Sequence, residues 1–84
     1  MKYESFKNKL NKLGDFKINE SVVGMNTIDE VYLINDETKI HISYGKMYGE
    51  IVSYKIYRAG FSTESFGYNG MNFLRALKAY LVAW

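Results

Sequence analysis

The chain has 84 residues and a formal charge of +2 at pH 7. It has no cysteine and one histidine, which excludes disulfide frameworks, thiolate catalysis and metal sites rich in Cys or His. Since 48% of the residues are apolar and 17% aromatic, we expect a single α+β domain over residues 1–84, stabilised by its core.

Charge is distributed unevenly along the chain. Residues 1–17 carry five lysines against two acids, residues 18–37 carry five acids and no base, and residues 38–84 carry six bases against two acids. This distribution predicts surfaces of opposite sign on one small body, which favours oriented contact with a charged partner.

The first segment has the period of an amphipathic helix. At 100° per residue its apolar side chains share one side, and they are Tyr3, Phe6, Leu10 and Leu13. We expect a helix over residues 2–13, which ends at Gly14 in a left-handed cap.

The middle of the chain changes to a period of two, typical of strands. The pattern does not decide whether residues 16–23 form a first strand. Three stronger strands follow in EVYLIN, KIHISY and EIVSYKIYR. The turns between them are NDET and GKMYG, so the strands pair antiparallel. The expected core positions are Ile40, Ile42, Tyr44, Val52, Tyr54 and Ile56, and the expected outer positions are Lys39, His41, Ser43, Ile51, Lys55 and Tyr57.

Residues 59–70 break this period with Gly, Ser and Asn, and we expect one long connection there. A second amphipathic helix follows over residues 71–83, with Asn69 or Gly70 as its N-cap. The predicted fold is a two-layer sandwich in the order α-β-β-β-β-α. It has a meander of three to four strands and both helices on one face, because two apolar helix stripes and one apolar sheet face form one core.

The sequence offers little from which to build an active site, and we expect no enzyme, no catalytic residue, no metal and no cofactor. His41 lies on the outer face without an acid in its strand. Adjacent carboxylates on a strand, such as Asp29 and Glu30, point to opposite sides, and Asp36 with Glu37 belongs to the turn NDET. The glycine segments GFSTE and GYNG lack the remaining residues of a nucleophile elbow and of a phosphate-binding loop.

Aromatic residues exceed what a core of this size holds, and exposed rings are typical anchors of protein interfaces. The expected protein-binding residues are Tyr57, Phe61, Phe66, Tyr68 and Met71. Outward apolar residues on the second helix extend this expectation to a possible homodimer.

Nucleic-acid binding is the alternative, through basic helix faces or the open face of the sheet. Its candidate residues are Lys9, Lys12, Lys39, Lys55, Arg58, Arg75 and Lys78. The order α-β-β-β-α is shared with double-stranded RNA-binding domains, although the second helix here has no base before Arg75. A net charge of +2 is also low for a phosphate-driven binder.

The preferred hypothesis is a non-enzymatic, cytoplasmic protein-binding domain without membrane contact. The residues of A/T-rich codons, Phe, Tyr, Met, Ile, Asn and Lys, make up 40 of the 84, which favours a bacterial or phage accessory protein. We expect it to act as a stoichiometric inhibitor or adaptor of a host factor, such as a defence or regulatory protein. The partner's identity is not encoded in these residues.

Overall fold

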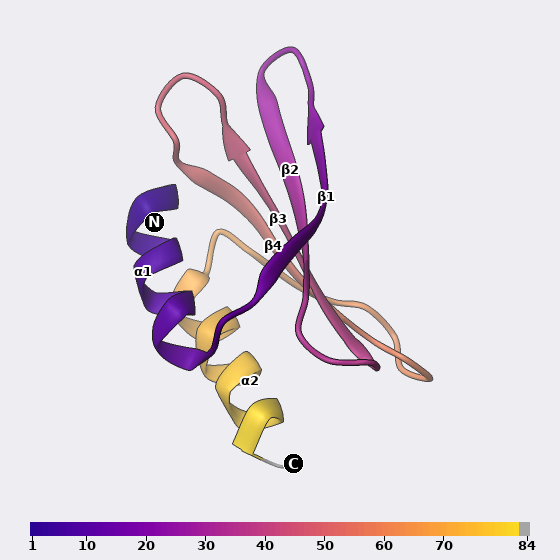
Figure 1. Ribbon diagram of the computed structural model, residues 1–84. Helices are drawn as coiled ribbons and strands as arrows, with labels where there is room; N and C mark the ends of the chain where they lie inside the picture. Colours follow the sequence, from indigo (N-terminus) through magenta and orange to yellow (C-terminus); the bar gives the residue numbers. More distant parts are fainter. Residues whose placement is uncertain (83–84) are drawn as a thin grey trace.

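The computed structural model describes residues 1–82, which form two helices and one five-stranded sheet (Figure 1). In chain order the elements are α1 (Tyr3–Leu13), β1 (Lys17–Val23), β2 (Thr27–Leu33), β3 (Thr38–Gly45), β4 (Ile51–Arg58), β5 (Glu64–Gly67) and α2 (Gly70–Val82). The expected α+β class is confirmed. The strand near residues 16–23, which the sequence pattern did not decide, is present as β1.

The sheet is an antiparallel meander in which spatial order follows chain order from β1 to β5. The short connections determine this topology, because a connection of only a few residues lets the chain turn back beside the strand it has just left but does not let it cross over to form a parallel pair. Both helices lie against the same face of the sheet and leave the other face bare (Figure 1). The expected two-layer sandwich is therefore confirmed.

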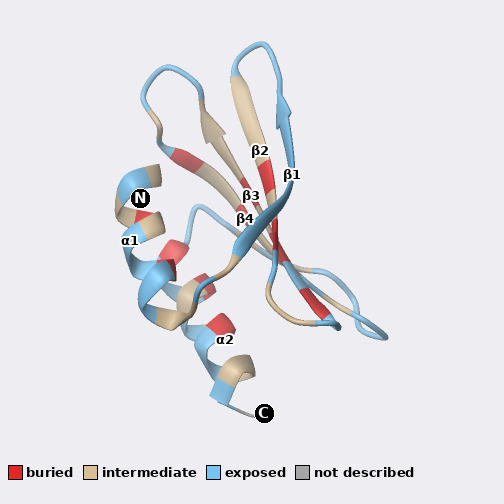
Figure 2. Ribbon diagram, viewed as in Figure 1, coloured by how far each residue is buried: buried red, intermediate tan, exposed pale blue. Residues whose placement is uncertain are grey.

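The core lies between the sheet and the two helices (Figure 2). It consists of the fully buried apolar side chains Phe6, Leu10, Tyr32, Ile40, Ile42, Ile51, Tyr54, Ile56, Phe73 and Leu77. The ring of Tyr54 lies 5.8 Å from that of Phe6 on α1 and 5.1 Å from that of Phe73 on α2. Phe6 and Phe73 are 6.0 Å apart, so three rings join both helices to one strand.

The start of β4 differs from the expected alternation. Ile51, expected outside, is 1% exposed, whereas Val52 is only half-buried. The cause is a register shift between Ser43 and Tyr44, after which Tyr44 pairs with Ile51. An inserted residue of this kind moves every earlier side chain of the strand to the other face.

The expected long connection is wrong in part, because residues 64–67 form strand β5 against β4. A four-residue strand ending in glycine gives almost no periodic signal in the sequence. Phe66 of β5 packs edge-on to Phe73, with 5.7 Å between the ring centroids. The true connections are residues 59–63 and 68–69.

The helix ends agree with the prediction except at Gly14. Its φ of 166° and ψ of 170° are extended, so the expected left-handed cap is wrong. A glycine is needed here for lack of space, because a Cβ at position 14 would lie 2.6 Å from Cζ of Phe16. At α2, the side-chain oxygen of Asn69 accepts a hydrogen bond from the Asn72 amide at 3.1 Å, which confirms Asn69 as the cap. Residue 83 of the predicted helix lies outside the described residues.

One buried carboxylate, Glu30 on β2, lies on the core side with only 5% exposure. Its two oxygens accept hydrogen bonds from the hydroxyls of Tyr32, at 2.8 Å, and Tyr44, at 3.2 Å. The Tyr3 hydroxyl is 3.2 Å from that of Tyr32, whose single proton is donated to Glu30, so Tyr3 is the donor of this pair. The carboxylate is thus satisfied by tyrosines of β2 and β3, and Tyr3 of α1 joins the network through Tyr32.

The Tyr54 hydroxyl has the opposite environment. It is buried, and among residues 1–82 it finds no hydrogen-bond partner. It faces Gly70 at the start of α2, where an added Cβ would lie 2.7 Å from the hydroxyl oxygen. The close approach of α2 to the sheet therefore depends on a residue without a side chain at this position.

We expect Tyr54→Phe and Tyr32→Phe to have different effects on stability. Tyr54→Phe removes an unpaired buried hydroxyl, so the free energy of unfolding should stay equal or rise by up to about 1 kcal/mol. Tyr32→Phe removes a hydrogen-bond donor from the buried Glu30 carboxylate, so the free energy of unfolding should fall by about 1–3 kcal/mol. Urea unfolding followed by circular dichroism measures both. Equal losses in the two variants would contradict this assignment.

Candidate binding surfaces

The first candidate surface is the face of the sheet that no helix covers, called here the open face. Strand pairing arranges its side chains in rows that run across the strands. One row is Lys17, Leu33, Lys39 and Tyr57, the next is Glu20, Val31, His41, Lys55 and Ser65, and the third is Val22, Asp29, Ser43 and Ser53. The first two rows bring together residues that are up to 45 positions apart.

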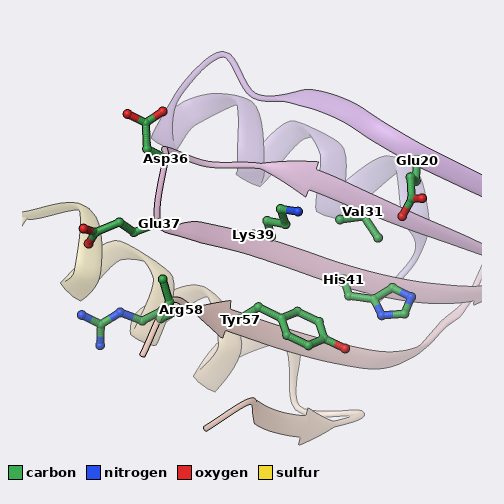
Figure 3. A pocket seen from close by; sticks show the side chains of 9 residues that line it. Glu20, Val31, Asp36, Glu37, Lys39, His41, Tyr57 and Arg58 are labelled. Carbon is green, nitrogen blue, oxygen red and sulfur yellow. The ribbon is translucent and has the colours of Figure 1, made fainter. Parts of the chain in front are cut away.

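Part of the open face is hollowed, with a volume of about 570 Å³ (Figure 3). Val31, His41 and Tyr57 form its centre, and the His41 and Tyr57 rings stack with centroids 6.4 Å apart. Leu33, in the same row as Tyr57, is 43% exposed, and Tyr57 is 40% exposed. These side chains form a partly apolar surface that is accessible to another molecule.

The charges of the open face are mixed. Lys39 lines the hollow together with the carboxylates of Glu20, Asp36 and Glu37, and Lys55 lies beside His41 in the middle row. Asp29 adds a further carboxylate and accepts a hydrogen bond from the Ser43 hydroxyl. Cations and anions therefore alternate here, which suits a partner that also carries both signs.

Arg58 lies beside the open face and, with Ala59, is among the residues that line the hollow (Figure 3). Unlike Lys39 and Lys55, it pairs in register with a buried residue, Thr38. Its guanidinium lies 4.5 Å from the Phe61 ring and 4.2 Å from the Tyr80 ring. Arg58 thus holds the β4–β5 turn against α2 through cation–π contacts.

The five expected protein-binding residues fall on separate parts of the molecule. Tyr57 lies on the open face, and Phe66 is half-buried against the core. Phe61, 67% exposed, covers Arg58, and Tyr68, 76% exposed, lies in the connection before α2. Met71 lies on α2, in the helix layer. The structure therefore does not unite these five residues into one surface.

The second candidate surface is a groove of about 250 Å³ between α1 and α2, called here the helix groove. It brings together four of the cations predicted from the helical wheels. Its lining residues are Lys9, Lys12, Leu13, Met71, Leu74, Arg75 and Lys78.

A third exposed cluster, at the tips of two neighbouring hairpins, was missed by sequence reasoning. Met25, in the β1–β2 turn, is 90% exposed, and Met47 and Tyr48, in the β3–β4 turn, are 82% and 75% exposed. The Lys46 amide donates to the Asn26 carbonyl at 2.9 Å and joins the two tips. The sequence did contain a signal for this cluster, because Met25, Met47 and Tyr48 are large apolar residues within turn sequences, where no core is available to bury them.

The buried Glu30 cluster was missed as well, because a single acid within a strand gives no sequence signal for burial. Burial raises the pKa of Tyr3, Tyr32 and Tyr44, and the Glu30 carboxylate raises each of them further. Phenols held in the neutral form beside a carboxylate that they satisfy are typical of a structural network.

Neither His41 nor any cluster of acids forms a recognisable catalytic or metal centre in the described part of the chain. His41 has no hydrogen bond to a carboxylate among residues 1–82, and no three His, Asp or Glu side chains gather there as metal ligands. None of the helices within residues 1–82 has the length and apolar character needed to cross a membrane. No family model, curated protein or solved structure matches this chain.

We expect stability to fall steeply above pH 10. Tyrosines of the unfolded chain ionise near pH 10, whereas burial raises the folded-state pKa of Tyr54 to about 12 and that of Tyr32 still further. Their contribution is complete below pH 10 and is lost as pH rises toward the folded-state pKa. Each such tyrosine lowers the free energy of unfolding by about 1.4 kcal/mol per pH unit in that window.

Urea unfolding at successive pH values from 8 to 12 measures this decline. Tyr54→Phe should make the decline above pH 10 less steep, because one of the contributing phenols is gone. A free energy of unfolding that stays constant from pH 10 to pH 12 would contradict the assignment.

Proposed function

We propose that this protein is a non-enzymatic binding domain that docks a partner protein on its open face. The observation that carries the proposal is that both helices cover one side of the sheet and leave the other side accessible. On that side Leu33, Tyr57 and His41 offer apolar and aromatic area within a border of mixed charge. An apolar centre with a polar rim is the usual anatomy of a protein interface.

The size of the molecule supports this function. Its accessible surface is 5451 Å², and a standard interface covers about 800 Å² of each partner, roughly a seventh of that total. A domain of this size then acts by occlusion, as a stoichiometric inhibitor or adaptor. For the bacterial or phage origin that the residue bias favours, we propose a cytoplasmic host factor as the partner.

Charge disfavours nucleic acid as the ligand of the open face. Lys17, Lys39 and Lys55 are offset there by Glu20 and Asp29, and Asp36 and Glu37 add negative charge at the edge. Binding to a phosphate backbone gains affinity with each cation that neutralises a phosphate, and carboxylates oppose it. The nucleic-acid alternative therefore depends on the helix groove.

The proposal is tested by affinity capture from a lysate of the host bacterium with two matched double variants. Leu33→Ser with Tyr57→Ser removes apolar and aromatic area from the open face, and Met47→Ser with Tyr48→Ser removes a similar pair from the hairpin tip. We expect one protein to be recovered at 1:1 stoichiometry by the parent chain and the tip variant. The open-face variant should bind it at least about tenfold more weakly, since central aromatic anchors dominate interface energies.

Native mass spectrometry gives the stoichiometry, and circular dichroism checks that both variants fold. The proposal fails if no stoichiometric protein is recovered. It also fails if the tip variant loses the partner while the open-face variant keeps it.

A further inference from the structure

The helix groove combines an apolar floor with positively charged borders. Its floor is apolar and consists of Leu13, Met71 and Leu74. Its borders carry Lys9 and Lys12 from α1 and Arg75 and Lys78 from α2, and no acidic residue lines it.

The positive charge of the groove is uncompensated within the described residues. Ion pairs in residues 1–82 join Glu50 to the N-terminal amine and to Lys2, and none involves the four groove cations. α2 contains no acid, and α1 contains only Glu4, which lies in the first turn, whereas Lys9 and Lys12 lie in the second half of the helix. Among the described residues that line the groove, a ligand would therefore meet four cations and no carboxylate.

The apolar floor restricts the chemistry of that ligand. Met71 is 55% exposed, and Leu13 and Leu74 are half-buried, so their contact area stays partly in water. A purely anionic ligand would leave this area unused, whereas apolar side chains gain about 25 cal/mol for each Å² that they cover. At about 250 Å³ the groove lies below the 300–1,000 Å³ of usual small-molecule sites. It suits a few side chains from a larger partner.

We propose that the helix groove binds an acidic amphipathic helix of a partner protein, with apolar side chains on the floor and carboxylates against the four cations. A helix fits because the groove lies between residues 9–13 of α1 and residues 71–78 of α2, and the ridge of a third helix can pack between two others. Recognition of an amphipathic helix in an apolar groove is a recurring mode of protein binding. This site goes beyond the proposed function, because it lies in the helix layer and not on the open face.

A second copy of this chain is a poor occupant of the groove. Its acidic segment, residues 18–37, forms β1, β2 and their turns, and contains no helix. Contact between that hairpin and the groove of another copy would join two different surfaces. Such an association generates open chains unless its rotation closes.

The test uses a fluorescein-labelled, 15-residue synthetic helix with leucines on one face and glutamates elsewhere. Fluorescence anisotropy measures its affinity, and ¹⁵N amide shifts of the full chain locate it. We expect saturable binding with shifts at Lys9, Lys12, Met71 and Arg75. A peptide of identical composition but scrambled order should bind at least about tenfold more weakly, because it cannot present leucines and glutamates on opposite faces.

Two charge-reversal variants separate the groove from general electrostatic attraction. Lys9→Glu with Lys78→Glu should weaken binding of the ordered peptide about tenfold or more. Lys39→Glu with Lys55→Glu changes the net charge equally on the open face and should leave the affinity within about twofold. Met71→Asn should weaken binding about threefold by removing part of the floor.

Three results would overturn the proposal. The first is equal affinity for the ordered and scrambled peptides, and the second is an equal loss in the two charge-reversal variants. The third is a duplex RNA probe that binds the groove more tightly than the peptide, which would assign the four cations to phosphate recognition. Because these probes and variants leave Leu33 and Tyr57 unchanged, the outcome is independent of the open-face proposal.

Discussion

The contact of Phe6, Tyr54 and Phe73 is the interaction on which the rest of this structure depends. It is the place where α1, α2 and the sheet meet, with ring centroids between 5.1 and 6.0 Å apart. An 84-residue chain has apolar area for one core, so both helices must share a single face of the sheet. The lack of a side chain at Gly70 lets α2 approach Tyr54 closely enough to complete the junction.

That constraint also determines the two candidate surfaces. Placing both helices on one side exposes the opposite side of the sheet, where strand pairing aligns Leu33 with Tyr57 through Lys39. It also sets the helices near one another, which turns separate lysines and an arginine into the two borders of one groove. One surface carries both signs of charge and the other only positive charge, so the two would select different partners.

The sequence allowed the fold to be predicted where a periodic pattern was long. The stripes of α1 and α2 and the alternation in β3 identified the layers. The basic helix faces predicted from the sequence carry Lys9, Lys12, Arg75 and Lys78, and the structure brings these four cations to one groove. Prediction failed where the structure depends on contacts between distant segments. The shift opposite Tyr44 that buries Ile51, the pairing of short β5 and the burial of Glu30 all arise from a neighbouring strand or helix. The stacking of Arg58 was not predicted for the same reason, since its partners Phe61 and Tyr80 come from a turn and from α2.

The meander has a consequence for how the chain reaches its folded state. Every strand pairs with its neighbour in sequence, so each hairpin closes a loop of only a few residues, at a small cost in chain entropy. Most strand contacts therefore join residues that are close in sequence. Sheet proteins with such local contacts fold faster than those whose strands pair across long separations. Docking of α1 is the exception, because its first turn bonds to the β3–β4 turn through Tyr3 and Gly49. This contact of α1 therefore closes a far longer loop than any hairpin of the meander does.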